Sequence, residues 1–220
     1  MISEELYVKE DLKIEIRERI SYNITKRFID VILALAGLSI LVPLFLIVAI
    51  IIKIDDPNGP IVFSQIRVGK NGELFKMFKF RSMYADAETK LASLLELNEI
   101  EGSMFKMRED PRITRIGKFI RKCSIDELPQ LFNVLLGNMS LVGPRPALPR
   151  EVATYSDFDK QRLLVIPGIT GLWQVSGRNS LTFQEMVALD LKYIQLRSIR
   201  LDFKLLFRTI KEVISHQNAY

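Results

Sequence analysis

The chain has 220 residues, enough for one domain with a real core, and it contains one cysteine and one histidine. These counts exclude an internal disulfide and argue against Ser-His-Asp, Cys-His and multi-histidine metal sites. The sequence is 48% hydrophobic and 26% charged, with a net charge of +5 and a pI of about 9.3. This balance indicates an apolar segment joined to a charged body and an anionic partner, whether membrane surface, nucleic acid or phosphorylated substrate.

The first 25 residues form a polar leader in which Ile14, Ile16 and Ile20 recur at helical spacing, which predicts a surface helix. No apolar run occurs before residue 28, so we expect no cleavable signal peptide. The next segment, "VILALAGLSILVPLFLIVAIII" (31–52), has 22 residues without a charge. A straight helix of that length can cross a bilayer.

Basic residues flank the apolar segment on both sides, among them Lys26 and Arg27 before it and Lys53 after it. Because basic residues favour the cytoplasmic side, both ends are assigned to the same side, and Pro43 at the midpoint would kink the helix. We therefore predict a re-entrant hairpin broken at Pro43, with one transmembrane span as the alternative. Asp30 follows the two basic residues by one turn and can pair with either of them. Three parts result: a leader (1–25), a re-entrant membrane helix (26–54) and a cytoplasmic catalytic domain (55–220).

A turn cluster, "DDPNGP", precedes two β-type runs. The runs "IVFSQIRV" and "LFKMFKF" flank "GKNGE" and predict a β-hairpin around Asn71 and Gly72. In "KFRSM", Lys79 and Arg81 alternate with phenylalanine, so both side chains can project from one face of a strand. Residues 84–101 have the pattern of an acidic amphipathic helix with a solvated face.

The segment "RITRIGKFIRK" (112–122) holds five basic residues and no acid, with apolar residues at helical spacing. Such a helix lies well on an anionic membrane surface, although a charged helix covering a core explains most of these residues equally well. Arg112 and Arg121 belong to it. Arg121 comes five residues before Asp126 and is the one we expect to face a site.

Two carboxylates, Asp126 and Glu127, stand side by side in "CSIDELPQLFNVLLG". Ser124 and Glu127 have the spacing of a capping box, but a helix capped at Ser124 would place Pro129 too deep. A helix start at Asp126 or Leu128, with Pro129 in the first turn, fits better. Both acids then lie at a helix N-terminus, where the helix dipole keeps them ionised. This pattern alone does not separate a structural role from a functional one.

Further basic groups stand in segments that resemble structured loops. Arg145 lies between two prolines in "GPRPAL", whose fixed φ angles make a stiff mount for a guanidinium that suits phosphate. Arg178 is presented in "PGITGLWQVSGRN", with Gln174 nearby. With the acid pair, these groups could form a metal–diphosphate site, because carboxylates suit Mg²⁺. The last segment, "RLDFKLLFRTIKEVI" (200–214), predicts a second amphipathic helix, either packed on the core or interfacial.

Four stretches together resemble the bacterial sugar transferase family of monotopic phosphoglycosyl transferases. They are "KRFID" leading into an apolar run with a central proline, "FKFRSM", "DPRITRIGKFIRKCSIDELPQLFNVLLGNMSLVGPRPALPRE" and "VIPGITGLWQVSGRN". The resemblance runs from about residue 26 to 214. Larger relatives carry several transmembrane helices before this domain, so the chain resembles the compact form. The family often has Ser-Pro at the helix break, whereas this chain has Val42-Pro43.

The resemblance implies transfer of a sugar-1-phosphate from a UDP-sugar to polyprenyl (undecaprenyl) phosphate with release of UMP. It implies Mg²⁺ as cofactor and the cytoplasmic face of the bacterial inner membrane as location, at the start of polysaccharide or glycan assembly. Membrane lipids and downstream glycosyltransferases are the further expected partners, and nucleic acid is not expected. The nucleophile would be Asp126, forming a covalent phospho-sugar aspartate, with Glu127 assisting and both acids holding the metal.

The implied fold is α+β and mainly helical, with a re-entrant membrane helix hairpin broken at Pro43, interfacial amphipathic helices and a small β-hairpin. Residues expected to bind substrate or phosphate are Lys79, Arg81, Arg112, Arg121, Arg145, Gln174, Arg178 and Asp202. The alternative function is a non-catalytic membrane-anchored scaffold whose basic helix binds anionic lipid. That alternative gives no reason for the acid pair or for the stiff mount of Arg145.

Overall fold

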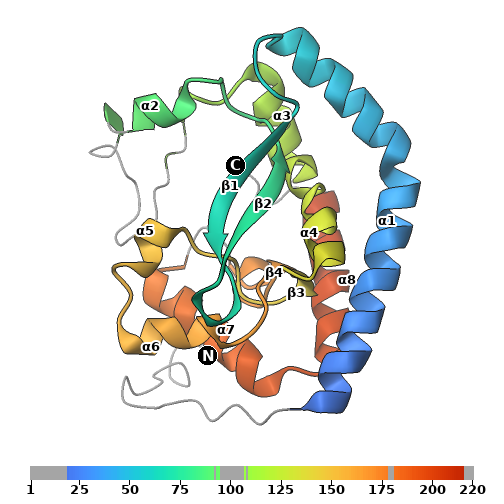
Figure 1. Ribbon diagram of the computed structural model, residues 1–220, viewed down its shortest axis with the longest axis vertical. Helices are drawn as coiled ribbons and strands as arrows, with labels where there is room; N and C mark the ends of the chain where they lie inside the picture. The colour runs from blue at the N-terminus through green and yellow to red at the C-terminus, as the bar shows by residue number, and fades with distance from the viewer. Residues whose placement is uncertain (1–18, 92, 95–106, 108, 178–180, 216–220) are drawn as a thin grey trace.

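A single long helix, α1 (Ile20–Asp55), runs along one side of the molecule in the computed structural model, which describes residues 19–91, 93–94, 107, 109–177 and 181–215 (Figure 1). The helix has 36 residues and continues through Pro43. The break predicted at Pro43 is therefore absent from this structure, and the re-entrant topology stays a prediction. A proline removes one intrahelical hydrogen bond, which a long helix can accommodate by bending. Figure 1 shows α1 curved, with its C-terminal part leaning back over the body of the molecule.

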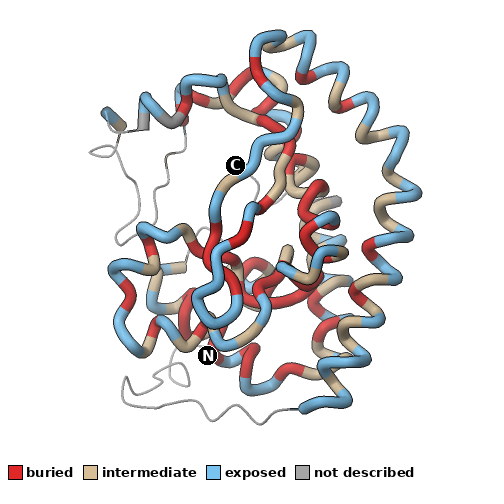
Figure 2. The backbone as a smooth tube through the Cα atoms, in the orientation of Figure 1, coloured by how far each residue is buried: buried red, intermediate tan, exposed pale blue. Residues whose placement is uncertain are grey.

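The start of α1 lies earlier than predicted, so residues 20–25 of the expected leader are helical, whereas residues 1–18 lie outside the described residues. Most of the surface of α1 is exposed although it is apolar (Figure 2). Ile40, for example, is 76% exposed. Among the described residues, α1 is the one helix long and apolar enough to cross a membrane. An apolar surface of this extent indicates association with a membrane.

The predicted β-hairpin is confirmed. β1 (Val62–Val68) pairs antiparallel with β2 (Leu74–Phe80), and a short 3₁₀ turn (Lys70–Gly72) joins them. Asn71 and Gly72 have φ angles of 54° and 86°, in the left-handed region that these two residue types adopt most readily. The register pairs Phe63 with Lys79 and Arg67 with Phe75, which puts both basic side chains on one face of the hairpin.

The described elements between the hairpin and the second sheet are short helices and a 3₁₀ turn. It contains α2 (Ala87–Leu91), α3 (Arg115–Lys122), a 3₁₀ turn (Ile125–Glu127) and α4 (Gln130–Leu136). The α2 helix covers only part of the acidic helix predicted over 84–101 and begins three residues later than predicted, and residues 92 and 95–101 of that prediction lie outside the described residues. The predicted basic helix, α3, begins after Thr114, whose side chain accepts a hydrogen bond from the amide of Gly117. The α4 helix ends at Gly137, which has a φ of 86°.

A second sheet has two parallel strands, β3 (Ser140–Val142) and β4 (Gly168–Thr170). The elements between and after these strands are α5 (Pro149–Val152), α6 (Asp157–Lys160), two 3₁₀ turns (Gln161–Leu164 and Trp173–Val175), α7 (Phe183–Leu196) and α8 (Ile199–Ser215). The α8 helix confirms the helix predicted near the C-terminus. A Cβ atom at Gly168 would lie 2.0 Å from the amide nitrogen of Gly143, so only glycine allows this close approach.

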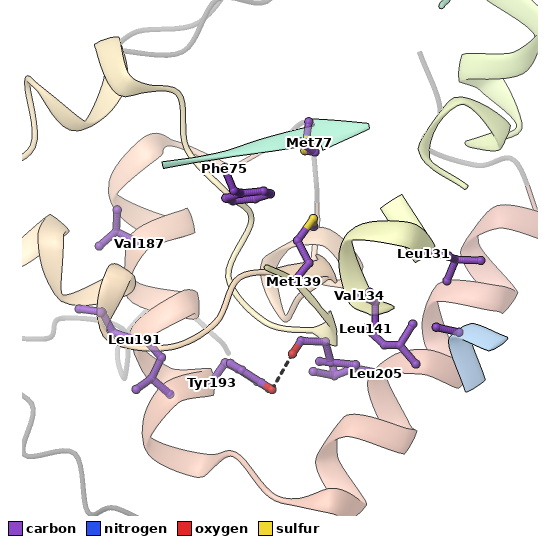
Figure 3. Packing of buried hydrophobic residues seen from close by; sticks show 13 residues of the cluster. Phe75, Met77, Leu131, Val134, Met139, Leu141, Val187, Leu191, Tyr193 and Leu205 are labelled. Carbon is purple, nitrogen blue, oxygen red and sulfur yellow. Dashed lines mark hydrogen bonds between the residues drawn. The ribbon is translucent and has the colours of Figure 1, made fainter. Parts of the chain in front are cut away.

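One hydrophobic core joins the hairpin to α4, β3, α7 and α8 (Figure 3). Met77 from β2, Val134 from α4 and Leu205 from α8 are among its members. At its centre, the buried Tyr193 hydroxyl donates a hydrogen bond of 3.1 Å to the carbonyl of Val142. Because these elements share one core, the hairpin is fixed against the helix that follows the acid pair.

Candidate active site

The acid pair lies in the 3₁₀ turn between α3 and α4. Ser124, directly before the turn, has a φ of 55°, an unusual value for a residue other than glycine, and its side chain makes no capping bond. The α-helix itself starts at Gln130, later than predicted. The reason is that the amides of Leu131 and Phe132 bond to carbonyls three residues earlier, which makes the first turn 3₁₀ rather than α.

Lys79 on β2 holds both carboxylates. Its Nζ lies 2.7 Å from Oε1 of Glu127 and 3.7 Å from Oδ2 of Asp126. Nη1 of Arg145 lies 3.6 Å from the same Glu127 oxygen. Arg121, near the end of α3, acts electrostatically on Asp126. The structure thus brings together five of the residues that the sequence nominated, from three separate segments.

The nucleophile candidate is buried, since only 6% of Asp126 is exposed. Burial raises the pKa of the Asp126 carboxyl above its usual value. Lys79 opposes this increase, the neighbouring Glu127 adds to it, and Arg121 and Arg145 oppose it. The cations are therefore what favours the ionised form of Asp126.

Hydrogen bonds hold the loop that carries Arg145. The carbonyl of Pro144 accepts a hydrogen bond of 2.8 Å from the amide of Gly168. On the other side of Arg145, the carbonyl of Pro146 accepts one of 3.1 Å from Nη1 of Arg67, and the carbonyl of Ala147 accepts one of 2.9 Å from the amide of Val68. Two prolines restrict the φ angles of the same loop. The rigid loop expected from the sequence is thus held by hydrogen bonds from both β4 and β1.

Arg67 is a site residue that the sequence reasoning missed. Its buried guanidinium bonds to the carbonyl of Pro146 and to the side-chain oxygen of Gln65, at 2.8 Å. Burial and the nearby Arg145 lower the pKa of Arg67 to about 10. The signal lay in the hairpin register, because strand alternation around Asn71-Gly72 puts Arg67 on the same face as Lys79.

Two arginines expected to bind phosphate make ion pairs with nearby aspartates, and their phosphate binding stays a prediction. Arg81 pairs with Asp56 at 3.3 Å, and a Cβ atom at Gly59 would lie 1.2 Å from its Nη1, so the guanidinium is packed under the turn that follows α1. Arg112 makes a buried pair with Asp110 at 2.6 Å. Neither contact includes the acid pair.

Gln174 lies in the 3₁₀ turn after β4, where its Nε2 donates a 3.1 Å hydrogen bond to the carbonyl of Ile169. Arg178 lies outside the described residues. The structure therefore gives Gln174 a place against the second sheet.

Asp202 sits in a different cluster, at the junction of α1 with α7 and α8. Its Oδ2 accepts hydrogen bonds from Lys26 and from the hydroxyl of Tyr22, both at 2.9 Å, and its Oδ1 accepts one from Tyr193 at 2.8 Å. Lys26 thus contacts Asp202 rather than Asp30, the partner considered from the sequence. Asp30 instead accepts a hydrogen bond from the amide of Leu141.

Arg27, the other basic residue before the apolar segment, contacts α4. Its guanidinium donates to the carbonyls of Val134 and Leu135, at the C-terminal end of that helix. Unpaired carbonyls and the negative end of the helix dipole favour a cation at this position. The predicted pairing of Arg27 with Asp30 is replaced by this contact.

The carboxylates suit one class of metal. Within the described part of the chain there is no group of three or more His, Cys, Asp or Glu residues arranged to hold an ion. Mg²⁺ commonly takes one or two carboxylates and completes its shell with water and substrate phosphates. Asp126 and Glu127 therefore fit a Mg²⁺ ion that binds together with a diphosphate.

Comparison with known proteins gives consistent results. Residues 21–216 match the protein family described as bacterial sugar transferase. The galactosyl transferase CpsE of Streptococcus agalactiae is 52% identical over 197 residues, covering 88% of this chain and 43% of that protein. The undecaprenyl-phosphate galactose phosphotransferase of Salmonella typhimurium is 42% identical, covering 89% and 41%. The exopolysaccharide production protein ExoY of Sinorhizobium fredii is 40% identical, covering 90% and 88%. The chain therefore spans less than half of the first two relatives and most of the third.

Proposed function

Because the chain belongs to the bacterial sugar transferase family, we propose that it transfers a sugar-1-phosphate from a UDP-sugar to undecaprenyl phosphate. The observation that carries the proposal is the acid pair, held by Lys79 and Arg145 in a molecule with an exposed apolar helix. Two relatives are named for transferring galactose or glucose units to undecaprenyl phosphate. We place the reaction on the cytoplasmic face of the bacterial inner membrane, at the start of polysaccharide assembly.

In the first step, an oxygen of the Asp126 carboxylate attacks the phosphorus that carries the sugar. The bond from this phosphorus to the oxygen of UMP breaks, and UMP leaves with the electron pair. The product is a covalent phospho-sugar aspartate, which divides one difficult transfer into two easier ones. The attack requires ionised Asp126, and Lys79 favours that form despite the burial of the carboxyl.

In the second step, a phosphate oxygen of undecaprenyl phosphate attacks the same phosphorus. The Asp126 oxygen leaves, which restores the carboxylate and yields a sugar linked to the lipid by a diphosphate. Lys79 and Arg145 stabilise the negative charge on the phosphoryl oxygens in both steps. Mg²⁺, when held by Asp126 and Glu127, supplies further charge neutralisation on the diphosphate.

The test combines UMP release with intact mass. Purified protein in detergent with Mg²⁺ is offered a panel of UDP-sugars, with and without undecaprenyl phosphate. We expect acceptor-dependent UMP release with at least one sugar, and a phospho-sugar mass adduct without acceptor. Asp126→Asn should lose both, whereas Asp157→Asn, a matched change at an exposed acid on α6, should keep both. Folded wild-type protein that neither releases UMP nor forms an adduct with any sugar would overturn the proposal and favour the scaffold.

A further inference from the structure

An open apolar groove lies between α1, the β-hairpin and α4, with a volume of about 470 Å³. Every side chain that lines it is apolar. Aromatic rings dominate the lining, which includes Phe45, Phe78, Phe80, Pro129, Phe132 and Leu136. An open apolar surface of this kind marks a site for a ligand or a lipid.

The two sides of the groove differ in packing. On one side, Phe45 of α1 and the buried Phe80 of β2 contact each other edge to face, with ring centroids 5.2 Å apart. On the other side, Phe132 and Leu136 of α4 are 47% and 66% exposed. The groove therefore combines a fixed aromatic wall with apolar side chains that no described part of the chain covers.

The lining of the groove begins close in sequence to the acid pair. Pro129, part of the lining, comes two residues after Glu127. Phe78 and Phe80 flank Lys79 in β2, so the aromatic rings and the lysine project from opposite faces of one strand. The cations that suit a phosphate therefore lie on the face of β2 opposite to these rings, and the turn from Glu127 to Pro129 connects the acid pair to the groove that suits a hydrocarbon.

We propose that this groove binds the isoprene units of the polyprenyl acceptor nearest its phosphate, an inference that rests on the function proposed above. The juxtaposition fits an amphiphile with an anionic head at Lys79 and Arg145 and an apolar tail in the groove. A peptide fits less well, because the lining offers no polar group to its backbone. The wall from α1 places the groove on the membrane helix, where a lipid-borne acceptor arrives.

The test uses the two half-reactions separately. Phe132→Gln and Leu136→Gln place a polar amide in the groove at exposed positions, where folding should tolerate it. Phe207→Gln is the matched control, because Phe207 is 69% exposed on α8 and lies outside the groove. We measure adduct formation from the UDP-sugar without acceptor, and then the KM for undecaprenyl phosphate in mixed micelles.

Both groove variants should form the adduct at the wild-type rate but show a KM for undecaprenyl phosphate raised roughly tenfold, equivalent to about 1.4 kcal/mol. The control should keep the wild-type KM. An unchanged KM in the groove variants would overturn the inference, and so would an equal rise in all three variants, which would indicate weakened membrane attachment. Failure of the wild-type protein to form an adduct would instead contradict the proposed function. Should Phe132→Gln fail to fold, Leu136→Gln decides alone, with Leu136→Met as the conservative variant expected to behave as wild type.

Discussion

Replacing Lys79 by methionine removes the cation that holds both acids while keeping much of the side-chain volume. In the structure, Nζ of Lys79 lies 2.7 Å from Glu127 and 3.7 Å from Asp126. We expect this substitution to lower the rate of UMP release strongly while leaving the fold intact. The reason is that the nucleophile would then face a second carboxylate without the cation nearest to both.

The size of the loss follows from the distances and the exposure. Two unit charges about 4 Å apart attract by roughly 4 kcal/mol at an effective dielectric constant near 20. The side chains of Lys79, Asp126 and Glu127 are 18%, 9% and 23% exposed, so solvent weakens this attraction only in part. If the substitution loses between about 2 and about 4 kcal/mol of this attraction, kcat/KM should fall by roughly 30- to 1000-fold.

The pH profile gives a second, independent readout. Burial raises the pKa of Asp126, and Lys79 opposes that increase. Without Lys79 the pKa should rise further, so more of the carboxyl is protonated at neutral pH, and activity should recover as the pH increases. The acidic limb of single-turnover UMP release should therefore move to higher pH in Lys79→Met, at constant saturating Mg²⁺.

Two controls separate charge from packing. Lys79→Arg keeps the cation and should keep the acidic limb close to that of the wild type. Lys76→Met removes an exposed lysine from the same strand and should change neither rate nor profile. A Lys79→Met protein that retains its rate within threefold, or loses rate without moving the limb, would show that Lys79 does not govern the ionisation of Asp126.

Two further substitutions address how the site is held. Asn133→Leu, at a fully buried side chain, leaves the part-buried amide of Phe78 and the part-buried carbonyl of Lys76 without their side-chain partner. At about 1–3 kcal/mol for each group, thermal unfolding should shift down by at least about 4 °C, and a smaller shift would contradict the role of this side chain. Arg67→Met removes the bond to the carbonyl that follows the site arginine, and kcat/KM should fall at least about tenfold, as expected for one lost hydrogen bond from a charged group. Arg81→Met removes an equally buried arginine whose ion pair is with Asp56, and it should lower stability with little change in kcat/KM per folded molecule. Equal losses in the two arginine variants would point to general destabilisation.

Local patterns in the sequence were sufficient for the hairpin and for the main charged groups of the site. Asn71-Gly72 fixed the turn because few other residue pairs adopt two positive φ angles easily. Lys79 and Arg145 were nominated because their residue types suit phosphate, and the structure brings both to Glu127. The role of Arg67 depends on the strand register and on the loop around Arg145, which lies 78 positions away in the chain, so its residue type alone does not indicate that role.

Long-range contacts account for the other differences. The contact between Lys26 and Asp202 joins residues 176 positions apart, and no local spacing predicts it. The turn after α1 places Asp56 beside Arg81, a contact that the spacing within the strand does not predict. Pro43 is a physical reason for the helix to bend, but whether a helix bends or breaks depends on what packs against both of its halves.

The small α4 helix contacts both α1 and the elements that hold the acid pair. Its first turn follows the acid pair, and Asn133 in its middle bonds to the backbone of β2 on both sides of Met77, close to Lys79. Its last carbonyls accept hydrogen bonds from Arg27 of α1, and a Cβ atom at Gly37 of α1 would lie 3.3 Å from Leu131. A chain of packed contacts therefore runs from α1 through this seven-residue helix to the turn that carries Glu127. The position of α1 is thus linked by direct contacts to the helix that follows the acid pair.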